Sequence, residues 1–179
     1  ECDLSDANLE GLDLRGANLS GSELHGSNLS GVNLNGADMS SSHLHAVDFR
    51  GTKLTGANFK YSNLEYANFT GTKLNKVNFS LAFLLRARFA QAELFDVDLT
   101  GADLGRANFF QASLYNVNLR WARLDNSNFV QALVSGDTNL NEADLSKANL
   151  SEANFNQTNL GRANISEAKL CNTKTPWGI

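Results

Sequence analysis

Proline is almost absent from this chain, and cysteine is scarce. Pro176 is the single proline among 179 residues, and the 14 glycines are spread along most of the length, so no change in composition marks a linker between domains. Cys2 and Cys171 stand near opposite ends of the chain. A disulfide needs Cα atoms within about 7 Å, which an elongated fold does not allow for this pair. These scarcities predict one domain without a covalent cross-link.

Long apolar runs and catalytic signatures are also missing. No segment is apolar over the length of a membrane-spanning helix, and the chain contains no GxSxG, P-loop, HExxH or paired-cysteine motif. We therefore expect no membrane span, no enzymatic activity and no cofactor. The chain starts at Glu1 rather than at a methionine, which leaves the compartment open. The compartments that the sequence allows are the cytoplasm and, if an export signal has been removed, the periplasm or the thylakoid lumen.

The net charge of −4 is unevenly distributed along the chain. Residues 1–48 contain eight acids and one base, a net charge of −7, whereas residues 49–92 contain seven bases and one acid, a net charge of +6. Residues 93–179 contribute the remaining −3. This asymmetry either steers a charged partner and favours head-to-tail association, or is an ordinary solvated surface.

What the sequence does contain is a five-residue repeat. An apolar residue occupies every fifth position from Leu4 to Val134 and, after a slip of one residue, from Leu140 to Leu170, thirty-four positions in all. A small residue usually stands two positions earlier, and the residue between them is commonly Asn or Asp. Five helical residues advance about 140°, which would spread the leucines around a helix. A short extended segment followed by a two-residue corner instead buries the small and the large residue together.

The phenylalanines predict how many repeats close a coil. They recur every 20 residues in one column (Phe49, Phe69, Phe89, Phe109, Phe129) and in a second column offset by ten (Phe59, Phe79). Four repeats therefore form one square coil with stacked rings in its core. Thirty-four repeats form about eight coils, a rod about 40 Å long at about 4.8 Å per coil.

These patterns predict an all-β solenoid that extends over residues 1–174 as a single domain. The slip in register predicts a one-residue bulge near 134–139, at a corner. Residues 175–179 follow the last repeat, either as a cap in which Trp177 folds over the final coil or as a frayed tail.

Segments such as Ala17-Asn18-Leu19-Ser20-Gly21 and Ala148-Asn149-Leu150-Ser151 resemble the consensus of the pentapeptide-repeat family. The resemblance covers the chain from about Cys2 to Asn172 and is similar in detail to cyanobacterial and plastid members. It implies a right-handed quadrilateral parallel β-helix, and it carries no catalytic residues. One branch of the family protects DNA gyrase by imitating duplex DNA, and this is one alternative function. A DNA mimic needs acids along its whole length, whereas residues 49–92 are basic.

The three histidines suggest a second alternative, a metal-binding protein. His25, His43 and His45 fall on one outer wall together with Glu23, in two successive coils. A spacing of about 4.8 Å between coils allows His25 and His45 to share a zinc or copper ion, with Glu23 or His43 completing an open site. The other interpretation is a solvated wall without metal, and no metal is expected.

Apolar residues at outward or corner positions of the middle coils predict an interaction patch. Tyr61, Leu81 and Trp121 belong to one corner column, and Phe83 and Leu85 lie on the next wall. Tyr66 and three arginines, Arg86, Arg106 and Arg123, complete the set. Exposed aromatics beside arginine are typical of interaction hot spots. The alternative is that these residues are scattered singly over several walls.

The function predicted from these observations is a non-catalytic structural or protein-interaction scaffold. Its partner is another protein or a second copy of the chain, bound by the middle coils. Acids on both sides of the basic segment and a pI near 5.3 argue against nucleic acid as a partner.

Overall fold

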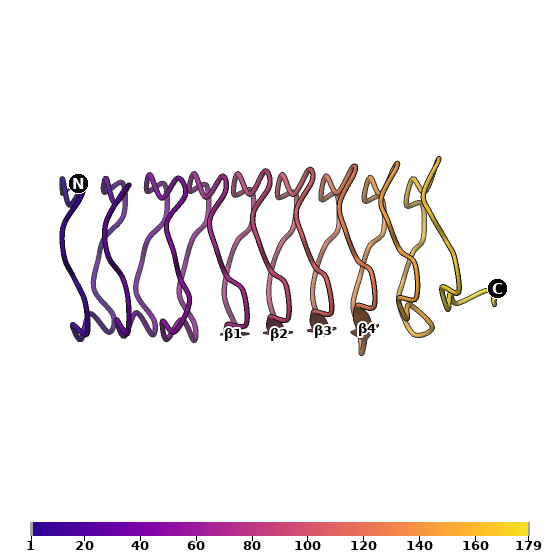
Figure 1. Ribbon diagram of the computed structural model, residues 1–179, viewed down its shortest axis with the longest axis horizontal. Helices are drawn as coiled ribbons and strands as arrows, with labels where there is room; N and C mark the ends of the chain where they lie inside the picture. The colour runs from indigo at the N-terminus through magenta and orange to yellow at the C-terminus, as the bar shows by residue number, and fades with distance from the viewer. Residues whose placement is uncertain (1, 179) are drawn as a thin grey trace.

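The computed structural model describes residues 2–178. Glu1, at the start of the predicted solenoid, and Ile179, at the end of the predicted tail, lie outside the described residues. Figure 1 shows one continuous stack of coils along a single axis, with the two ends of the chain at opposite ends of the stack. Residues 2–178 contain no helix, and therefore none that is long and apolar enough to cross a membrane.

Each repeat contributes one wall of a coil, and parallel bridges join it to the repeats 20 residues away. Asn58 pairs with Asp38 on one side and with Asn78 on the other. Four walls recur in order, and we name them by their central buried residues: wall A contains Leu64 and Leu84, wall B Phe69 and Phe89, wall C Leu74 and Leu94, and wall D Phe59 and Phe79. The prediction of four repeats per coil is confirmed, and the fold is a right-handed quadrilateral parallel β-helix.

Within residues 2–178, regular strands form only on wall C. They are β1 (Lys73–Asn75), β2 (Glu93–Phe95), β3 (Ser113–Tyr115) and β4 (Leu133–Ser135), which form one parallel sheet in the order β1-β2-β3-β4. The register pairs Leu74 with Leu94 and Leu94 with Leu114. The remaining walls are joined by single bridges, because each repeat is extended for only three residues before the next corner.

Phenylalanine rings fill the centre of the rod. All seven predicted core phenylalanines have no exposed surface. Successive rings of wall B are nearly parallel, with centroids 4.6–5.0 Å apart. Phe59 and Phe79 of wall D stack at 5.1 Å, and Phe59 meets Phe49 edge to face at 5.5 Å. Offset and edge-to-face contacts of this kind stabilise aromatic cores beyond the area that they bury.

Side-chain oxygens satisfy the backbone at the corners, which explains the residue types of the repeat. The outward Asn or Asp accepts the backbone N–H two residues later, as Asn68 does from Thr70 at 3.1 Å. Where the small inward residue is Ser or Thr, its hydroxyl donates to the carbonyl three residues earlier, as Thr52 does to Phe49 at 2.6 Å. Such local bonds make these polar residues favourable in turns and tolerable in the core.

The register slip lies in one turn, Ser135-Gly136-Asp137. Before it, bridged residues are 20 apart, as in Ser113 with Leu133. Across it they are 21 apart, as in Asn118 with Asn139, and from Asn139 with Asn159 the spacing is 20 again. The extra residue therefore enlarges one corner between walls C and D and leaves the walls intact.

The solenoid continues slightly beyond residue 174. Lys174 bridges Asn154, and Thr175 occupies an inward position with 4% of its surface exposed. Trp177 is 57% exposed, so its side chain does not lie over the last coil as a cap would.

Candidate interaction surfaces

Wall A and its two corners carry a cluster of exposed apolar side chains, which we call the wall A patch. Its members share two successive coils and are Tyr61, Tyr66, Leu81, Phe83 and Leu85. Phe83 is 53% exposed and Tyr61 is 51% exposed, whereas Leu85 is half-buried. Both coils place these side chains outward because the inward positions between them are filled by buried residues such as Ala82 and Leu84.

The backbone fixes where the wall A patch points. Phe83 stands at the outward position that Asn or Asp occupies in most repeats, where its N–H donates to the carbonyl of Ser62 and its carbonyl accepts from the N–H of Leu64, both in the preceding coil. Tyr61, Tyr66 and Leu81 stand at corners with φ of 57–60°. This left-handed conformation is unfavourable for bulky residues, by about 1–2 kcal/mol each. The fold therefore tolerates large apolar side chains at positions that suit glycine.

Glycines in the next coil make room for the two leucines of the patch. A Cβ at Gly101 would lie 2.8 Å from Leu81 Cδ2, and a Cβ at Gly105 would lie 3.1 Å from Leu85 Cδ1. Each leucine therefore leans along the rod over a glycine. Leu81 and Leu85 therefore lie along the surface beside Phe83 and do not project from it separately.

Cations border the wall A patch. The guanidinium of Arg86 donates to the Tyr66 hydroxyl at 3.3 Å and lies 5.5 Å from the centre of that ring. Lys60 lies 4.9 Å from the centre of the Tyr61 ring. Arg106 follows Arg86 along the same corner and forms no ion pair within residues 2–178. Three cations therefore border the patch, together with the acids Glu65 and Asp103 of wall A.

Trp121 and Arg123 were predicted to belong to this set, and the structure places them apart from it. Trp121 lies two coils beyond Leu81, donates its indole N–H to Glu142 at 3.1 Å and contacts the Arg120 guanidinium at 4.0 Å. Arg123 forms ion pairs with Asp103 at 3.1 Å and with Asp125 at 2.6 Å. Both side chains therefore bond partners of their own, which are not among the five apolar residues of the wall A patch.

A second apolar surface lies on the opposite wall. This wall C patch consists of Phe95, Tyr115 and Leu133, each 44–48% exposed, on strands β2 to β4. The rings of Phe95 and Tyr115 stack with centroids 5.1 Å apart. A shallow groove of about 320 Å³ runs beside them. Phe95 and Tyr115 are 20 residues apart in the sequence and occupy one column, whereas Leu133 belongs to the column of Glu93 and Ser113.

The histidine cluster divides into two separate parts. Glu23 accepts from His43 Nδ1 at 2.5 Å and lies 3.7 Å from His25 Nδ1, which also contacts the Ser5 hydroxyl at 3.3 Å. His45 turns away and packs edge to face against Tyr66, with ring centroids 5.4 Å apart. His25 and His45 therefore have different neighbours, and no contact joins their side chains within the described residues. Within residues 2–178, no group of three or more His, Cys, Asp or Glu side chains is arranged to hold a metal ion.

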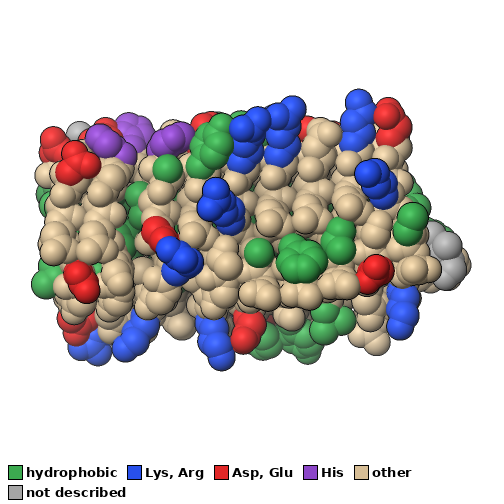
Figure 2. Space-filling model, viewed as in Figure 1, with side chains coloured by type: hydrophobic (Ala, Val, Ile, Leu, Met, Phe, Trp, Pro, Cys, Tyr) green, Lys and Arg blue, Asp and Glu red, His purple; other side chains and the backbone are tan. Residues whose placement is uncertain are grey.

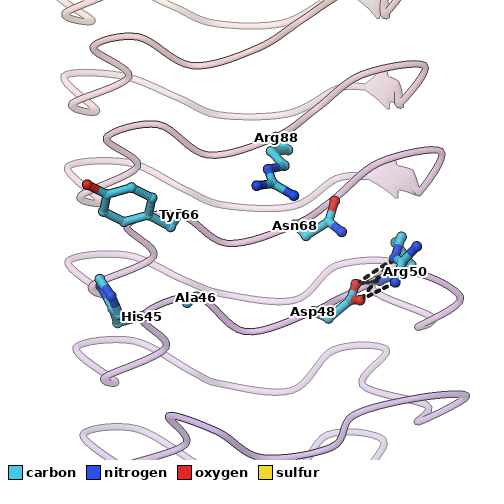
Figure 3. A pocket seen from close by; sticks show the side chains of 7 residues that line it. All are labelled: His45, Ala46, Asp48, Arg50, Tyr66, Asn68 and Arg88. Carbon is cyan, nitrogen blue, oxygen red and sulfur yellow. Dashed lines mark hydrogen bonds and ion pairs between the residues drawn. The ribbon is translucent and has the colours of Figure 1, made fainter.

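A third surface feature is a groove of about 720 Å³ on wall B, beside the corner with wall A. Figure 3 shows its lining side chains, with Tyr66 and His45 at one end, the ion pair of Asp48 and Arg50 at the other, and Arg88 above Asn68 between them. Arg50 donates to both carboxylate oxygens of Asp48, at 2.7–3.0 Å. This bonding lowers the pKa of Asp48 and keeps it ionised and occupied by its own arginine.

The uneven charge of the sequence is visible on the surface. In Figure 2, acids and histidines gather toward the N-terminal end of the rod, and a row of Lys and Arg follows along the same edge near its middle. The cysteines, Cys2 and Cys171, are both exposed and free.

The repeats match a model of known families. The model described as Pentapeptide repeats matches residues 2–41, 42–80, 92–131 and 138–174. No curated protein sequence matches the chain.

Several solved structures are similar to this one. HetL of the cyanobacterium Nostoc sp. strain PCC 7120, described as involved in the regulation of heterocyst differentiation, is 28% identical with a TM-score of 0.67, and the match covers 99% of this chain and 90% of HetL. A pentapeptide repeat protein from the thylakoid lumen of Arabidopsis thaliana is 27% identical over 62% of this chain and 69% of that one, with a TM-score of 0.32. QnrB1, a plasmid-mediated fluoroquinolone resistance protein, is 20% identical over 93% and 81%, with a TM-score of 0.47.

Proposed function

This chain belongs to the pentapeptide-repeat family, and we propose that it is a non-catalytic scaffold that docks another protein on the wall A patch. The observation that carries the proposal is the exposure of Tyr61, Leu81 and Phe83 on two adjoining coils, at positions where the repeat ordinarily has Gly, Asn or Asp. Contiguous apolar surface of this kind marks interaction sites in proteins.

The rigidity of the rod supports this function. Backbone bonds join neighbouring coils on all four walls, and the core is continuous, so the wall A patch is held in one arrangement before a partner arrives. A preorganised surface loses less conformational entropy on binding. The similarity to HetL, a protein described as a participant in regulation, is compatible with a role in binding rather than in catalysis.

The cations at the rim predict the charge of the partner's surface. Arg86, Arg106 and Lys60 border an apolar centre, so the complementary surface is apolar with acids around it. The same cations argue against imitation of duplex DNA, which needs a surface of negative charge, whereas residues 49–92 carry a net charge of +6.

The test uses cross-linking in cells of the organism that produces this protein, and it compares how much partner protein two triple variants capture. In the first, the wall A patch is returned to the residues that the repeat prefers, by Leu81→Gly, Phe83→Asn and Leu85→Ser. The matched control removes three apolar residues from the opposite wall, by Phe95→Ser, Tyr115→Ser and Leu133→Asn. We expect the first variant to capture a specific partner at least about tenfold less than the native chain, because it lacks the buried centre of the interface, and the control to capture it normally.

Light scattering on the same three proteins separates the possible occupants. A native monomer supports a different protein as the partner. A native dimer that the wall A variant alone converts to a monomer would show that a second copy occupies the patch. Equal capture by all three proteins would contradict the proposal, provided that circular dichroism shows each to be folded.

A further inference from the structure

The groove on wall B has the composition of a ligand site that none of the preceding arguments uses. Ligand pockets commonly measure about 300–1,000 Å³ and combine flat apolar walls with a few directed polar groups. At about 720 Å³ this groove lies within that range, and it spans three successive coils, in which Asp48, Asn68 and Arg88 are joined by parallel bridges.

The hollow arises from short side chains between long ones. Ala46 stands at the corner between walls A and B, where the following coils have Tyr66 and Arg86. Asn68 lies between the longer side chains of Arg88 and of the Asp48 and Arg50 pair (Figure 3). The short side chains of Ala46 and Asn68 therefore form the bottom of the groove, and the longer side chains around them form its sides.

The polar groups that face this hollow are mainly hydrogen-bond donors. Arg88 has no ion pair and no side-chain hydrogen bond to any residue in 2–178. Asn68 uses its Oδ1 atom to accept the Thr70 N–H, which leaves its Nδ2 amide as a donor. The one acid of the groove, Asp48, is already bonded through both oxygens by Arg50.

One end of the groove is aromatic. His45 and Tyr66 meet edge to face, and the Tyr66 hydroxyl is held by Arg86, which fixes the ring. A flat group that enters the groove has an aromatic wall on one side and a free guanidinium on the other. Arginine recognises carboxylate and phosphate oxygens through paired N–H donors.

We propose that the wall B groove binds an oxyanion, phosphate or carboxylate, carried on a flat ring, with Arg88 and Asn68 donating to the oxyanion and His45 and Tyr66 flanking the ring. The site adjoins the docking surface and shares Tyr66 with it, but Arg88 and Asn68 lie outside that surface, so the two proposals can fail independently. Its ligand is either a free small molecule or a phosphorylated tyrosine side chain of a partner protein.

The experiment is an NMR titration of the native chain with phenyl phosphate and, separately, with inorganic phosphate. We expect the amide signals of Asn68 and Arg88 to shift, with a Kd on the order of 1 mM for phenyl phosphate. Inorganic phosphate should bind about tenfold more weakly, because it makes no contact with the aromatic wall. No shift at these amides up to about 20 mM phenyl phosphate would overturn the proposal.

Three variants test the assignment. Arg88→Gln removes the free guanidinium and should weaken binding of phenyl phosphate at least about tenfold. The matched control Arg162→Gln makes the same change of charge several coils away from the groove and should alter binding less than about twofold. Ala46→Gln fills the floor at a corner of the kind where Gln91 and Gln111 already occur with the same backbone conformation, and it should abolish binding without unfolding.

The two sources of the oxyanion are distinguished by partner capture with the Arg88→Gln variant. Reduced capture together with reduced binding of phenyl phosphate identifies a phosphorylated tyrosine side chain of the partner. Normal capture with reduced binding identifies a small molecule. Equal binding of phenyl phosphate by the native chain and by Arg88→Gln would refute the site even if the wall A patch docks a partner as proposed.

Discussion

The corner of each repeat is where an individual residue matters most for this fold. The corner is a turn closed by a backbone bond, as between the N–H of Ala57 and the carbonyl of Leu54, and at most corners the third residue has positive φ. Glycine suits this conformation, and Asn and Asp tolerate it. Several further residue types have positive φ within residues 2–178, but none of them is β-branched, because a branched Cβ collides with the adjoining carbonyl.

Gly51 allows this rule to be tested without steric interference. Its φ is 74°, and a Cβ there would meet nothing within 4 Å. We expect Gly51→Val to lower the free energy of unfolding by about 1–2 kcal/mol, entirely through the backbone. Gly51→Asn is the matched control and should cost less than about 0.5 kcal/mol, because Asn adopts this conformation readily. Urea denaturation measures both, and equal losses would show that side-chain contacts rather than backbone conformation decide the cost.

One coil is the smallest unit that buries anything, because a single repeat has no neighbour to pack against. Within a coil, the phenylalanine of wall B and the leucines of walls A and C converge on one centre, and the coils above and below complete the contacts. Repeat proteins gain their stability in this way, from interfaces between successive units. The same residue type therefore contributes very differently to stability when it points into the coil and when it points outward.

Phe89 and Phe83 make this contrast measurable. Phe89 has no exposed surface and stacks on Phe69 at 5.0 Å and on Phe109 at 4.9 Å, whereas Phe83 is 53% exposed. We expect Phe89→Ala to lower the free energy of unfolding by about 3–5 kcal/mol, through lost stacking and a cavity. Phe83→Ala should lower it by less than about 0.5 kcal/mol. Thermal and urea unfolding give both values, and a large loss for Phe83→Ala would mean that the wall A patch has a structural role instead of a docking role.

The whole molecule is a rod in which register is transmitted from coil to coil. Every coil bonds to the next through parallel bridges, so an error of one residue at one corner would turn inward residues outward in everything that follows. The extra residue at Ser135-Gly136-Asp137 avoids this outcome because the turn alone expands, and Thr138 resumes the inward position with its hydroxyl bonded to Ser135 at 2.7 Å.

Deletion of one glycine at either of two corners tests this account. Removing Gly136 shortens the enlarged turn to the usual two residues, and we expect a folded chain with a melting temperature within a few degrees of the native value. Removing Gly71, a corner glycine with the ordinary spacing, leaves one residue too few for its corner and should cost more than about 4 kcal/mol. Circular dichroism melts of the two deletions decide the matter, and similar melting temperatures would argue that register is not transmitted.

The repeat allowed the architecture to be predicted residue by residue, because each position is decided by its immediate neighbours. The alternation of small, polar and large residues requires a short extended segment, and the 20-residue spacing of Phe49, Phe69 and Phe89 requires four segments per coil. The apolar residues on wall A could be predicted for the same reason, since their places in the repeat are outward or at corners.

Contacts between coils decided the side-chain partners and the surface features that the repeat pattern did not predict. Trp121 bonds Glu142, Arg123 bonds Asp103, and His45 packs on Tyr66, each across a separation of 20 or 21 residues. The wall C patch and the wall B groove likewise depend on which residues stand above one another and on how their side chains turn. A local pattern specifies the place of a residue on its wall, but the direction of a long side chain is set by the charge, size and hydrogen-bonding capacity of neighbours one coil away.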